Sequence, residues 1–301
     1  MIYELRHLTT YKYGRSVPFA RCVLRVSPRA DVEQTVTGRR LVITPKPTQL
    51  HETIGPFGET VVSATIATPH NELKILVTSK VEVNRPALKQ LFGGPAWETV
   101  REQGFASRSL DLASPAHFLY PTPMTASHRA ITAYAAQFMT PGRPVLEAAF
   151  AMARQIRADF TYDPASTEVS TPVIEAFEAR HGVCQDFAHI MISGLRGLGL
   201  PAAYVSGYLR TIPAPGKPRL EGADATHAWV NVWCGETLGW IGLDPTNALV
   251  VASDHIVLAV GRDYSDVAPI GGVVLGAGSQ DITVGVDVIP LGQDREIKAL
   301  G

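Results

Sequence analysis

The chain has 301 residues, enough to bury a sizeable core in one large domain or in two domains of ordinary size. Hydrophobic residues make up 46% of it and charged residues 18%, a balance typical of a folded globular protein and not of a disordered chain. The formal net charge of −1 gives no electrostatic reason to expect nucleic acid or an anionic membrane as a partner.

The first 85 residues predict a β-rich domain. Residues 60–68 and 73–83 are rich in Val, Ile and Thr and partly alternate between apolar and polar positions, which is typical of strands. A short Pro-His-Asn-Glu stretch separates them and predicts a turn, so we expect a hairpin. Residues 86–122 contain several glycines and prolines, which indicates a connecting region with short helical pieces.

A core of four helices followed by three strands is expected over residues 123–262. The predicted helices are 127–139, capped by Ser127, then 145–160, a helix from 171 to just before Gly182, and 184–198. The predicted strands are 203–210, 227–233 and 240–244. A C-terminal extension, 263–301, contains a glycine-rich loop at 271–278 and a final strand at 282–289, which we expect to join the N-terminal sheet. The fold class is α+β.

The sequence contains no motif for a membrane span, a metal site or a phosphate-binding cofactor. No apolar stretch reaches the length of a membrane span, and the first residues lack the apolar region of a secretory signal, so we expect a cytoplasmic protein. Cys22, Cys184 and Cys234 are too few for a disulfide framework and lack the paired spacing of a zinc site. The glycine-rich stretch at 271–278 lacks the Lys-Ser/Thr ending of a phosphate-binding loop. We therefore expect neither a cofactor nor a metal.

Cys184 stands at the predicted start of a helix, directly after Gly182 and Val183. A thiol there faces unpaired backbone N–H groups and the positive end of the helix dipole, which favour the nucleophilic thiolate. The alternative is that Cys184 is simply a small buried residue, as free cysteines commonly are. Cys22 and Cys234 have no histidine partner that the sequence can place, and we interpret both as structural thiols. A metal site made of Cys184, His189 and His227 is disfavoured, because residues five apart on a helix point to different faces.

A predicted hairpin brings His227 and Asp244 together. Its strands, 227–233 and 240–244, flank a Gly-Glu-Thr-Leu-Gly segment. With the turn centred between residues 235 and 236, His227 lies directly opposite Asp244, and opposed residues have Cβ atoms about 4.5–5.5 Å apart. The expected chemistry is a triad in which His227 takes the proton of Cys184 and Asp244 orients and stabilises the imidazolium. The backbone N–H of Cys184 would stabilise an oxyanion, and the Tyr162 hydroxyl is either a second donor or part of a core or interface. Trp229 would either shield the pair from water or pack as an ordinary hydrophobic residue.

Several motifs resemble those of transglutaminase-like proteins. The run GVCQDFAH at 182–189, continuing to GLP at 199–201 and VSGY at 205–208, is similar to the cysteine motif of that family. THAWV at 226–230 is similar to its histidine motif, with Thr226 where serine is commoner, and WIGLDPTN at 240–247 to its aspartate motif. Residues 3–28, GRDYSDV at 261–267 and the last strand resemble the bacterial members.

This resemblance implies a papain-like core, in which the cysteine helix packs against an antiparallel sheet carrying the histidine and the aspartate. It also implies an amide group of a peptide or protein as the substrate. Such folds include enzymes that crosslink glutamine to amines, enzymes that hydrolyse amides, and proteins with no catalysis. We favour hydrolysis slightly, because nothing in the sequence marks an amine site. The alternative from a different class is a non-catalytic binding or assembly module, which would not need an intact triad.

Overall fold

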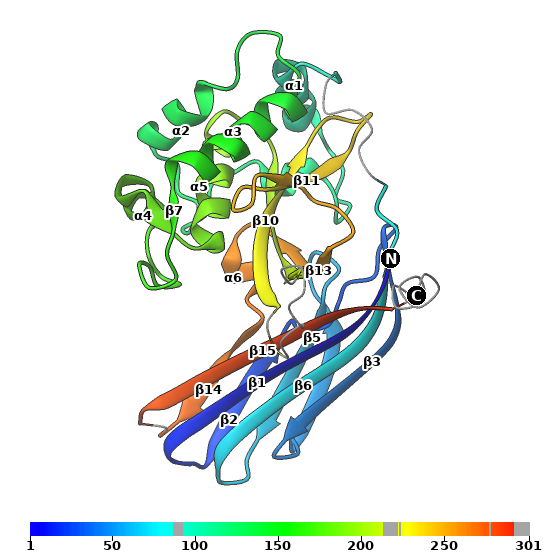
Figure 1. The fold of residues 1–301 in the computed structure, drawn as a ribbon, viewed down its shortest axis with the longest axis vertical. Helices are drawn as coiled ribbons and strands as arrows, with labels where there is room; N and C mark the ends of the chain where they lie inside the picture. Colours follow the sequence, from blue (N-terminus) through cyan, green and yellow to red (C-terminus); the bar gives the residue numbers. More distant parts are fainter. Residues whose placement is uncertain (87–92, 213–221, 223, 277, 292–301) are drawn as a thin grey trace, which may run out of the picture.

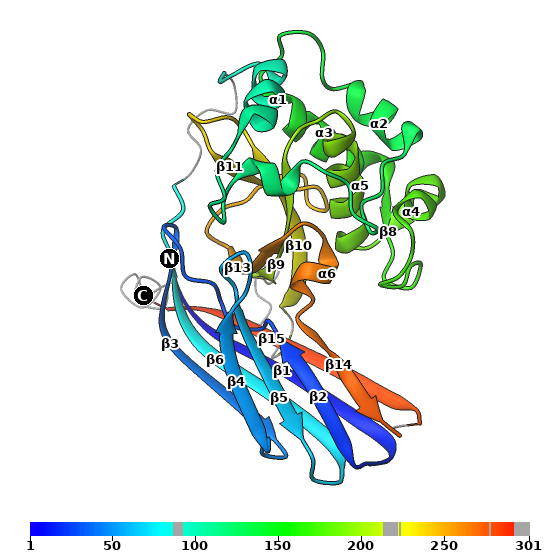
Figure 2. The same cartoon turned by 180° about the vertical axis from the view of Figure 1, so that it is seen from behind.

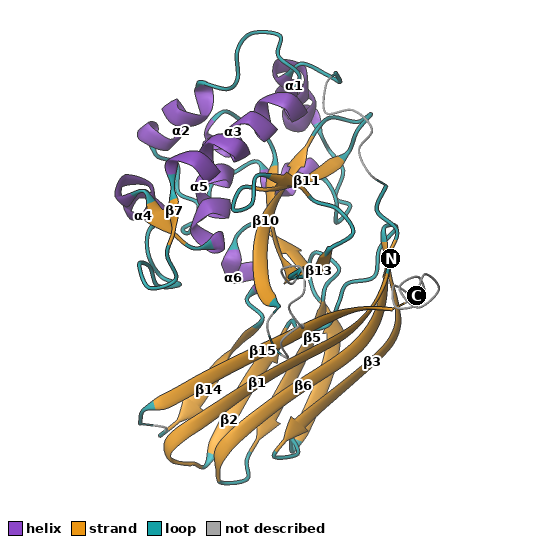
Figure 3. Cartoon of the chain, in the orientation of Figure 1, coloured by secondary structure: helices purple, strands orange, loops and turns teal. Residues whose placement is uncertain are grey.

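The computed structural model describes residues 1–86, 93–212, 222, 224–276 and 278–291. It has two parts: a sandwich of two four-stranded antiparallel sheets, and a core in which a five-stranded sheet packs against helices. Figure 1 shows the sandwich below and the core above, and Figure 3 shows that the long helices all lie in the core. The fold is α+β, as predicted.

The sandwich buries its own apolar core between its sheets. One sheet has the order β15-β1-β6-β3, from β15 (Gln280–Leu291), β1 (Ile2–Val17), β6 (His70–Val83) and β3 (Gln34–Thr44). The other has the order β14-β2-β5-β4, from β14 (Ile270–Leu275), β2 (Phe19–Leu24), β5 (Thr60–Ile66) and β4 (Gln49–Ile54). Val17, Leu24, Val62 and Ile75 are among the buried residues between them.

The predicted hairpin of residues 60–68 and 73–83 is wrong. Both segments are strands, but β5 pairs with β2 and β4, whereas β6 pairs with β1 and β3 in the opposite sheet. The turn between them carries the chain across the sandwich. Alternation of apolar residues predicts which face of a strand is buried, and it carries no information about the neighbouring strand.

The two last strands complete the N-terminal sandwich. β15 pairs antiparallel with β1 over its whole length, which is where we expected the final strand, and β14 pairs with β2 (Figure 2). Residues 271–275 are therefore not the predicted loop. Gly272 is needed in this strand, because a Cβ there would lie 2.2 Å from the carbonyl oxygen of Arg21. The glycines that suggested a loop thus allow close approach of two strands.

The core sheet has the order β12-β11-β10-β9-β13. Its strands are β12 (Leu249–Val250), β11 (Trp240–Asp244), β10 (Ala225–Trp233), β9 (Ala202–Leu209) and β13 (His255–Gly261). Its helices are α2 (Arg129–Ala136), α3 (Val145–Asp159), α4 (Val173–Ala179) and α5 (Cys184–Gly197). They bury an apolar stripe against one face of the sheet, including Ile156, Ile190, Val230 and Leu243. Ser127 does not cap α2, because the helix begins two residues later, after His128.

Shorter elements complete the fold. α1 (Trp97–Ala106) and the 3₁₀ helix η1 (Pro115–Phe118) lie in the connecting region. β7 (Thr161–Tyr162) pairs in parallel with β8 (His181–Gly182), and α6 (Tyr264–Val267) follows β13. Among the described residues, no helix is both long and apolar enough to cross a membrane.

The sandwich holds β13 of the core by side-chain hydrogen bonds. The Gln34 side chain donates to the carbonyl oxygen of Val257 at 2.8 Å and accepts from its N–H at 2.8 Å. Arg85 donates to the carbonyl oxygens of Ala252 and His255 at 2.8 and 3.1 Å. An apolar cluster that includes Tyr3, Val81, Tyr208 and Ile256 seals the same junction. β13 therefore has a fixed position relative to both parts.

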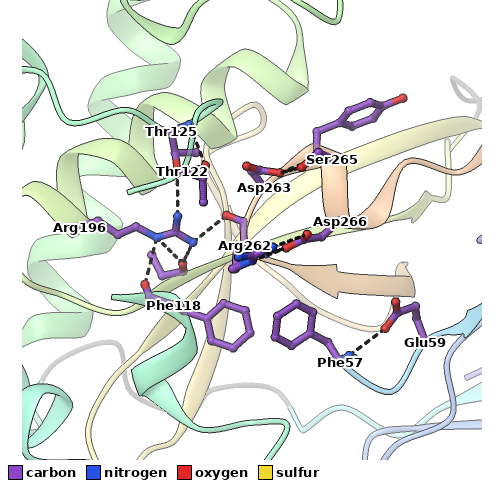
Figure 4. A network of polar contacts seen from close by, with 12 residues as sticks. Phe57, Glu59, Phe118, Thr122, Thr125, Arg196, Arg262, Asp263, Ser265 and Asp266 are labelled. Atoms are coloured by element: carbon purple, nitrogen blue, oxygen red, sulfur yellow. Dashed lines mark hydrogen bonds and ion pairs between the residues drawn. The ribbon is translucent and has the colours of Figure 1, made fainter. Parts of the chain in front are cut away.

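A buried arginine ties α5 to its surroundings (Figure 4). Arg196 is 5% exposed and donates to the carbonyl oxygens of Phe118, Ala202 and Arg262 and to the hydroxyl of Thr125, at 2.7 to 3.2 Å. Each acceptor lies in a different segment, so one guanidinium joins four segments to the helix. Its planar array of donors makes this possible, because a lysine has one point charge.

We expect Arg196→Met to lower the free energy of unfolding by about 3–5 kcal/mol, because it leaves buried acceptors without donors. Urea unfolding followed by circular dichroism measures this. The control is Arg154→Met, which removes an exposed arginine from α3 and should change stability by less than about 0.5 kcal/mol. Equal effects of the two substitutions would contradict this role for Arg196.

Candidate active site

Cys184 is the first residue of α5 and is partly exposed. The Asp186 carboxylate accepts the N–H of Val183 at 2.8 Å and the hydroxyl of Thr167 at 2.6 Å, which anchors the first turn of the helix. Gly182 leaves room for this, because a Cβ there would lie 2.7 Å from the same carboxylate oxygen. The sulfur thus stands at a well-formed helix N-terminus, where the dipole favours an anion.

His227 and Asp244 are in contact, although the predicted register is wrong. The hairpin pairs Val230 with Leu243 and Trp233 with Trp240, so its turn is centred one residue later than expected. Continued by one pair, this register sets Asp244 across from Trp229 and makes His227 its diagonal neighbour. A shift of two residues keeps both side chains on one face, where diagonal neighbours can meet. The Nε2 of His227 lies 2.8 Å from the Oδ2 of Asp244.

Asp244 is fully buried and satisfied by several donors. Its Oδ1 accepts the N–H groups of Thr246 and Asn247 at 2.9 and 3.1 Å. Its Oδ2 accepts the Asn247 side-chain amide at 2.7 Å, besides the two histidines His227 and His255 at 2.8 and 3.2 Å. Burial alone would raise the pKa of Asp244, but these hydrogen bonds outweigh burial and hold it well below its usual range. Asp244 is thus ionised at neutral pH.

The Cys184 thiol completes the contacts of His227. Burial lowers the pKa of His227, but hydrogen bonds with Asp244 and then with Cys184 outweigh burial and raise it to about 10. Since Nε2 faces Asp244, the other ring nitrogen, Nδ1, is left for the sulfur. The arrangement favours a protonated imidazole between the Asp244 carboxylate and the sulfur of Cys184, which is the source of a proton for the ring.

We expect the stability of the protein to depend on this proton. The folded protein binds the His227 proton more tightly than the unfolded chain, in which the pKa is 6.5. The resulting stabilisation is complete below pH about 6.5 and is lost as the pH rises towards about 10. The free energy of unfolding should therefore fall more between pH 6 and 9.5 in the wild type than in His227→Gln. Parallel curves for the two proteins would contradict the raised pKa.

Tyr162 lies near Cys184, and Trp229 lies near His227. β7 places Tyr162 beside Gly182, and its ring packs edge-on against Phe187 with centroids 6.4 Å apart. It is 50% exposed, and its pKa is raised by burial and then by the nearby Cys184. Trp229 is fully buried on the face of His227, with centroids 6.3 Å apart.

The other two cysteines have different environments. Burial raises the pKa of Cys22 and raises that of Cys234 to about 12, so both thiols resist ionisation. His189 accepts the N–H of Tyr264 at 3.2 Å, which gives it a structural role and not one in a metal site with Cys184.

Asn247 and His255 were not identified from the sequence. Asn247 follows Asp244 within the aspartate motif, and a turn residue so close to the carboxylate was the available signal. His255 lies on another strand, and no local pattern connects it with Asp244.

His227, Asp244 and His255 have the composition of a two-histidine, one-carboxylate metal site, with ligand atoms within 4.8 Å of one another. A metal on Nε2 of His255 would move its proton to Nδ1, which is buried and has no partner among the described residues. The three side chains fit hydrogen bonding to one another better than metal binding.

Known proteins share both parts of this chain. The family model of the transglutaminase-like superfamily matches residues 132–245, and that of the bacterial transglutaminase-like N-terminal region matches residues 3–82. Uncharacterized proteins of Mycobacterium tuberculosis and Mycobacterium leprae are 39% and 31% identical, over 97% and 95% of this chain and 94% and 97% of their own lengths. A protein-glutamine gamma-glutamyltransferase of Pseudomonas aeruginosa is 34% identical over 29% of this chain and 14% of its own.

One solved structure shares the whole architecture. A protein from Cytophaga hutchinsonii, named as a candidate cysteine protease, superimposes with a TM-score of 0.76 over 98% of this chain and 92% of its own, at 20% identity. With its sandwich, its papain-like core and both family matches, the chain belongs to the bacterial branch of the transglutaminase-like superfamily.

Proposed function

We propose that this protein is a thiol enzyme that acts on amide or peptide carbonyls through a thioester acyl-enzyme, with Cys184, His227 and Asp244 as its catalytic residues. The observation that carries the proposal is the buried 2.8 Å contact between His227 and ionised Asp244, beside a cysteine at a helix N-terminus. A histidine with only a structural role in the core needs a single hydrogen-bond acceptor. Neither a structural cysteine nor a binding surface requires contacts that run from Cys184 through His227 to Asp244.

The first half-reaction forms the thioester. His227 takes the proton of Cys184, and the thiolate attacks the carbonyl carbon of the substrate. The backbone N–H of Cys184 stabilises the negative charge on the carbonyl oxygen, and the Tyr162 hydroxyl is a candidate for a second hydrogen bond to that oxygen. The imidazolium then gives its proton to the departing amine, the C–N bond breaks, and the acyl group stays on sulfur.

The second half-reaction releases the acyl group. His227 takes a proton from water or from an amine as that molecule attacks the thioester carbonyl; the C–S bond then breaks, and His227 returns the proton to sulfur. Water gives hydrolysis, and an amine gives transfer. Trp229 fills the space beside His227 and keeps bulk water from it. Asp244 stabilises the imidazolium throughout.

We favour hydrolysis as the reaction, because nothing in the sequence marks an amine site. One experiment can distinguish hydrolysis from transfer to an amine. Casein, as a glutamine donor, is incubated with the protein and a labelled amine, and products are analysed by mass spectrometry. Cleaved peptides or deamidated glutamines support hydrolysis, whereas label attached to glutamine supports transfer, the activity named for the Pseudomonas relative. In both cases a Cys184→Ala sample serves as the blank. The proposal would be contradicted if neither casein nor any other protein or peptide in a test panel were cleaved, deamidated or labelled.

The partner in this proposal is a peptide or protein that presents an amide. We retain the cytoplasm as the proposed location, and fractionation of cells producing the tagged protein tests it. Recovery of the protein in an extracytoplasmic fraction would contradict that location.

A further inference from the structure

A single oxygen of Asp244 is shared by two imidazoles. Nε2 of His227 lies 2.8 Å from Oδ2, and Nε2 of His255 lies 3.2 Å from the same atom. His255 is 2% exposed, so solvent does not compete for this contact. A catalytic carboxylate needs one imidazole to orient, and the second histidine has no part in the mechanism above.

His255 reaches this oxygen across a neighbouring strand. The sheet order places β9 between His227 on β10 and His255 on β13, and Gly207 of β9 is paired with His227 on one side and Val257 on the other. The ring centroids of the two histidines are nevertheless only 6.2 Å apart. A Cβ at residue 207 would lie 2.4 Å from the Trp229 ring and 2.2 Å from the carbonyl oxygen of Ile256. The absence of a side chain at Gly207 thus leaves room for the aromatic cluster that holds both histidines.

The surroundings of His255 determine which of its ring nitrogens carries the proton that is donated to Asp244. Its Nδ1 is buried and has no hydrogen-bond partner among the described residues. A proton on Nδ1 would be an unsatisfied buried donor, whereas a proton on Nε2 is donated to Asp244. His255 thus donates its Nε2–H to Asp244. The edge-on contact with Trp229, at 5.2 Å between centroids, and the bond from Arg85 to its carbonyl oxygen fix its position.

We propose that His255 is a positioning residue that tunes the catalytic histidine, by donating a hydrogen bond to the carboxylate oxygen that His227 uses. This inference rests on the proposed function. Each donor on Oδ2 withdraws electron density from it, and so weakens the bond that the oxygen forms with His227. His255 therefore limits how strongly Asp244 holds the imidazolium.

The limit matters because His227 must give its proton away. An imidazolium that is held too tightly is a poor acid towards the departing amine, since general acid catalysis is most effective when the pKa is near the working pH. The pKa of His227 is raised far above its ordinary value by Asp244 and Cys184. Without the competing donor it would rise further.

The charged and titratable groups around His255 can be named for the part of the chain that the structure describes. Asp244 and His227 face the His255 ring, and Cys184 bonds to His227. The neighbouring Asp254 accepts the Tyr3 hydroxyl at 2.7 Å and pairs with Arg210 at 3.3 Å, and Arg85 faces the backbone of His255 and pairs with Glu33 at 2.7 Å. A change at His255 should therefore act on His227 through Asp244.

Alkylation of Cys184 by iodoacetate tests the proposal without a known substrate. The anionic reagent is attracted by the imidazolium, so its rate falls at alkaline pH as His227 loses its proton. His255→Leu and His255→Met remove the donor and should move the midpoint of this fall to higher pH by about 0.5–1 pH unit. His255→Gln keeps an N–H donor and should leave the midpoint within about 0.2 pH unit of the wild type.

A purely structural role would lower the melting temperature without moving this midpoint. A midpoint that is unchanged or lower in folded His255→Leu or His255→Met would overturn the tuning role. Nitrogen NMR of the wild type adds a test that does not need a variant, because a His255 without a proton on Nε2 would also overturn it. A wild type without an alkaline fall, in which Cys184 reacts like an ordinary thiol, would instead reject the proposed function.

Discussion

Replacing Cys184 with alanine should lower turnover of any amide substrate by at least about 10³-fold, because no other group in the site can form the thioester. The substitution removes one sulfur atom from a partly exposed position, so the fold should be retained. The measurement is the initial rate of peptide cleavage or amine incorporation, with circular dichroism to establish folding.

Cys234→Ala is the matched control. That thiol is fully buried, and burial raises its pKa to about 12, so it has no route to a thiolate at neutral pH. We expect its turnover to stay within about threefold of the wild type, although its stability should fall because a small core cavity is created. Comparable losses in the two variants would show that the reaction does not depend on a particular thiol.

Asp244→Asn should lower turnover by about 10²–10⁴-fold with a small change in KM, because the amide has nearly the same shape but no charge. The imidazolium of His227 then loses its principal stabilising partner, and the thiolate–imidazolium pair becomes less favourable. The acid limb of the alkylation rate of Cys184 should move to higher pH in this variant.

Asn247→Ala tests whether the charge or the hydrogen bonding of Asp244 matters more. It removes a neutral donor that lies 2.7 Å from the same oxygen and leaves the carboxylate in place. We expect a loss of less than about tenfold, in line with the value of one neutral hydrogen bond. A loss as large as that of Asp244→Asn would mean that the turn, and not the charge, determines activity.

Local patterns in the sequence predicted the helices α2 to α5 and the core strands β9, β10 and β11, but not β12 or β13. α3 and α5 lie within two residues of their predicted bounds, because an apolar stripe at helical spacing is a strong signal and Gly199 and Pro201 mark the end of α5. Two of the three residues proposed for the triad lie at element ends, where such patterns are also informative, whereas His227 is the third residue of β10. Cys184 begins a helix and Asp244 ends a strand.

Pairing between strands was less predictable, because it depends on distant segments. β5 and β6 are neighbours in sequence but lie in opposite sheets, and β6 pairs instead with β1 and β3. The hairpin register was wrong by two residues because the turn is centred between residues 236 and 237 and not between 235 and 236, with Gly239 donating to the carbonyl oxygen of Gly235 at 2.8 Å. The error did not separate His227 from Asp244, since an even shift preserves the face.

His255 shows what sequence patterns could not supply. It reaches Asp244 from a strand that is not adjacent to the hairpin, over a glycine on the strand between. In the local sequence, His255 and this glycine look like ordinary strand residues. Only the order of the strands in the sheet brings His255 close to the Asp244 carboxylate.

The rate at which iodoacetamide alkylates Cys184 at pH 6, set against glutathione under the same conditions, tests the central claim most directly. Peptide mass spectrometry assigns the labelled cysteine, and His227→Gln measures the contribution of the imidazole. A thiolate held by His227 should react at least about 100-fold faster than glutathione, whose thiol is almost fully protonated at this pH, and the advantage should disappear in His227→Gln. A wild-type rate equal to that of glutathione would contradict activation of the sulfur by the histidine.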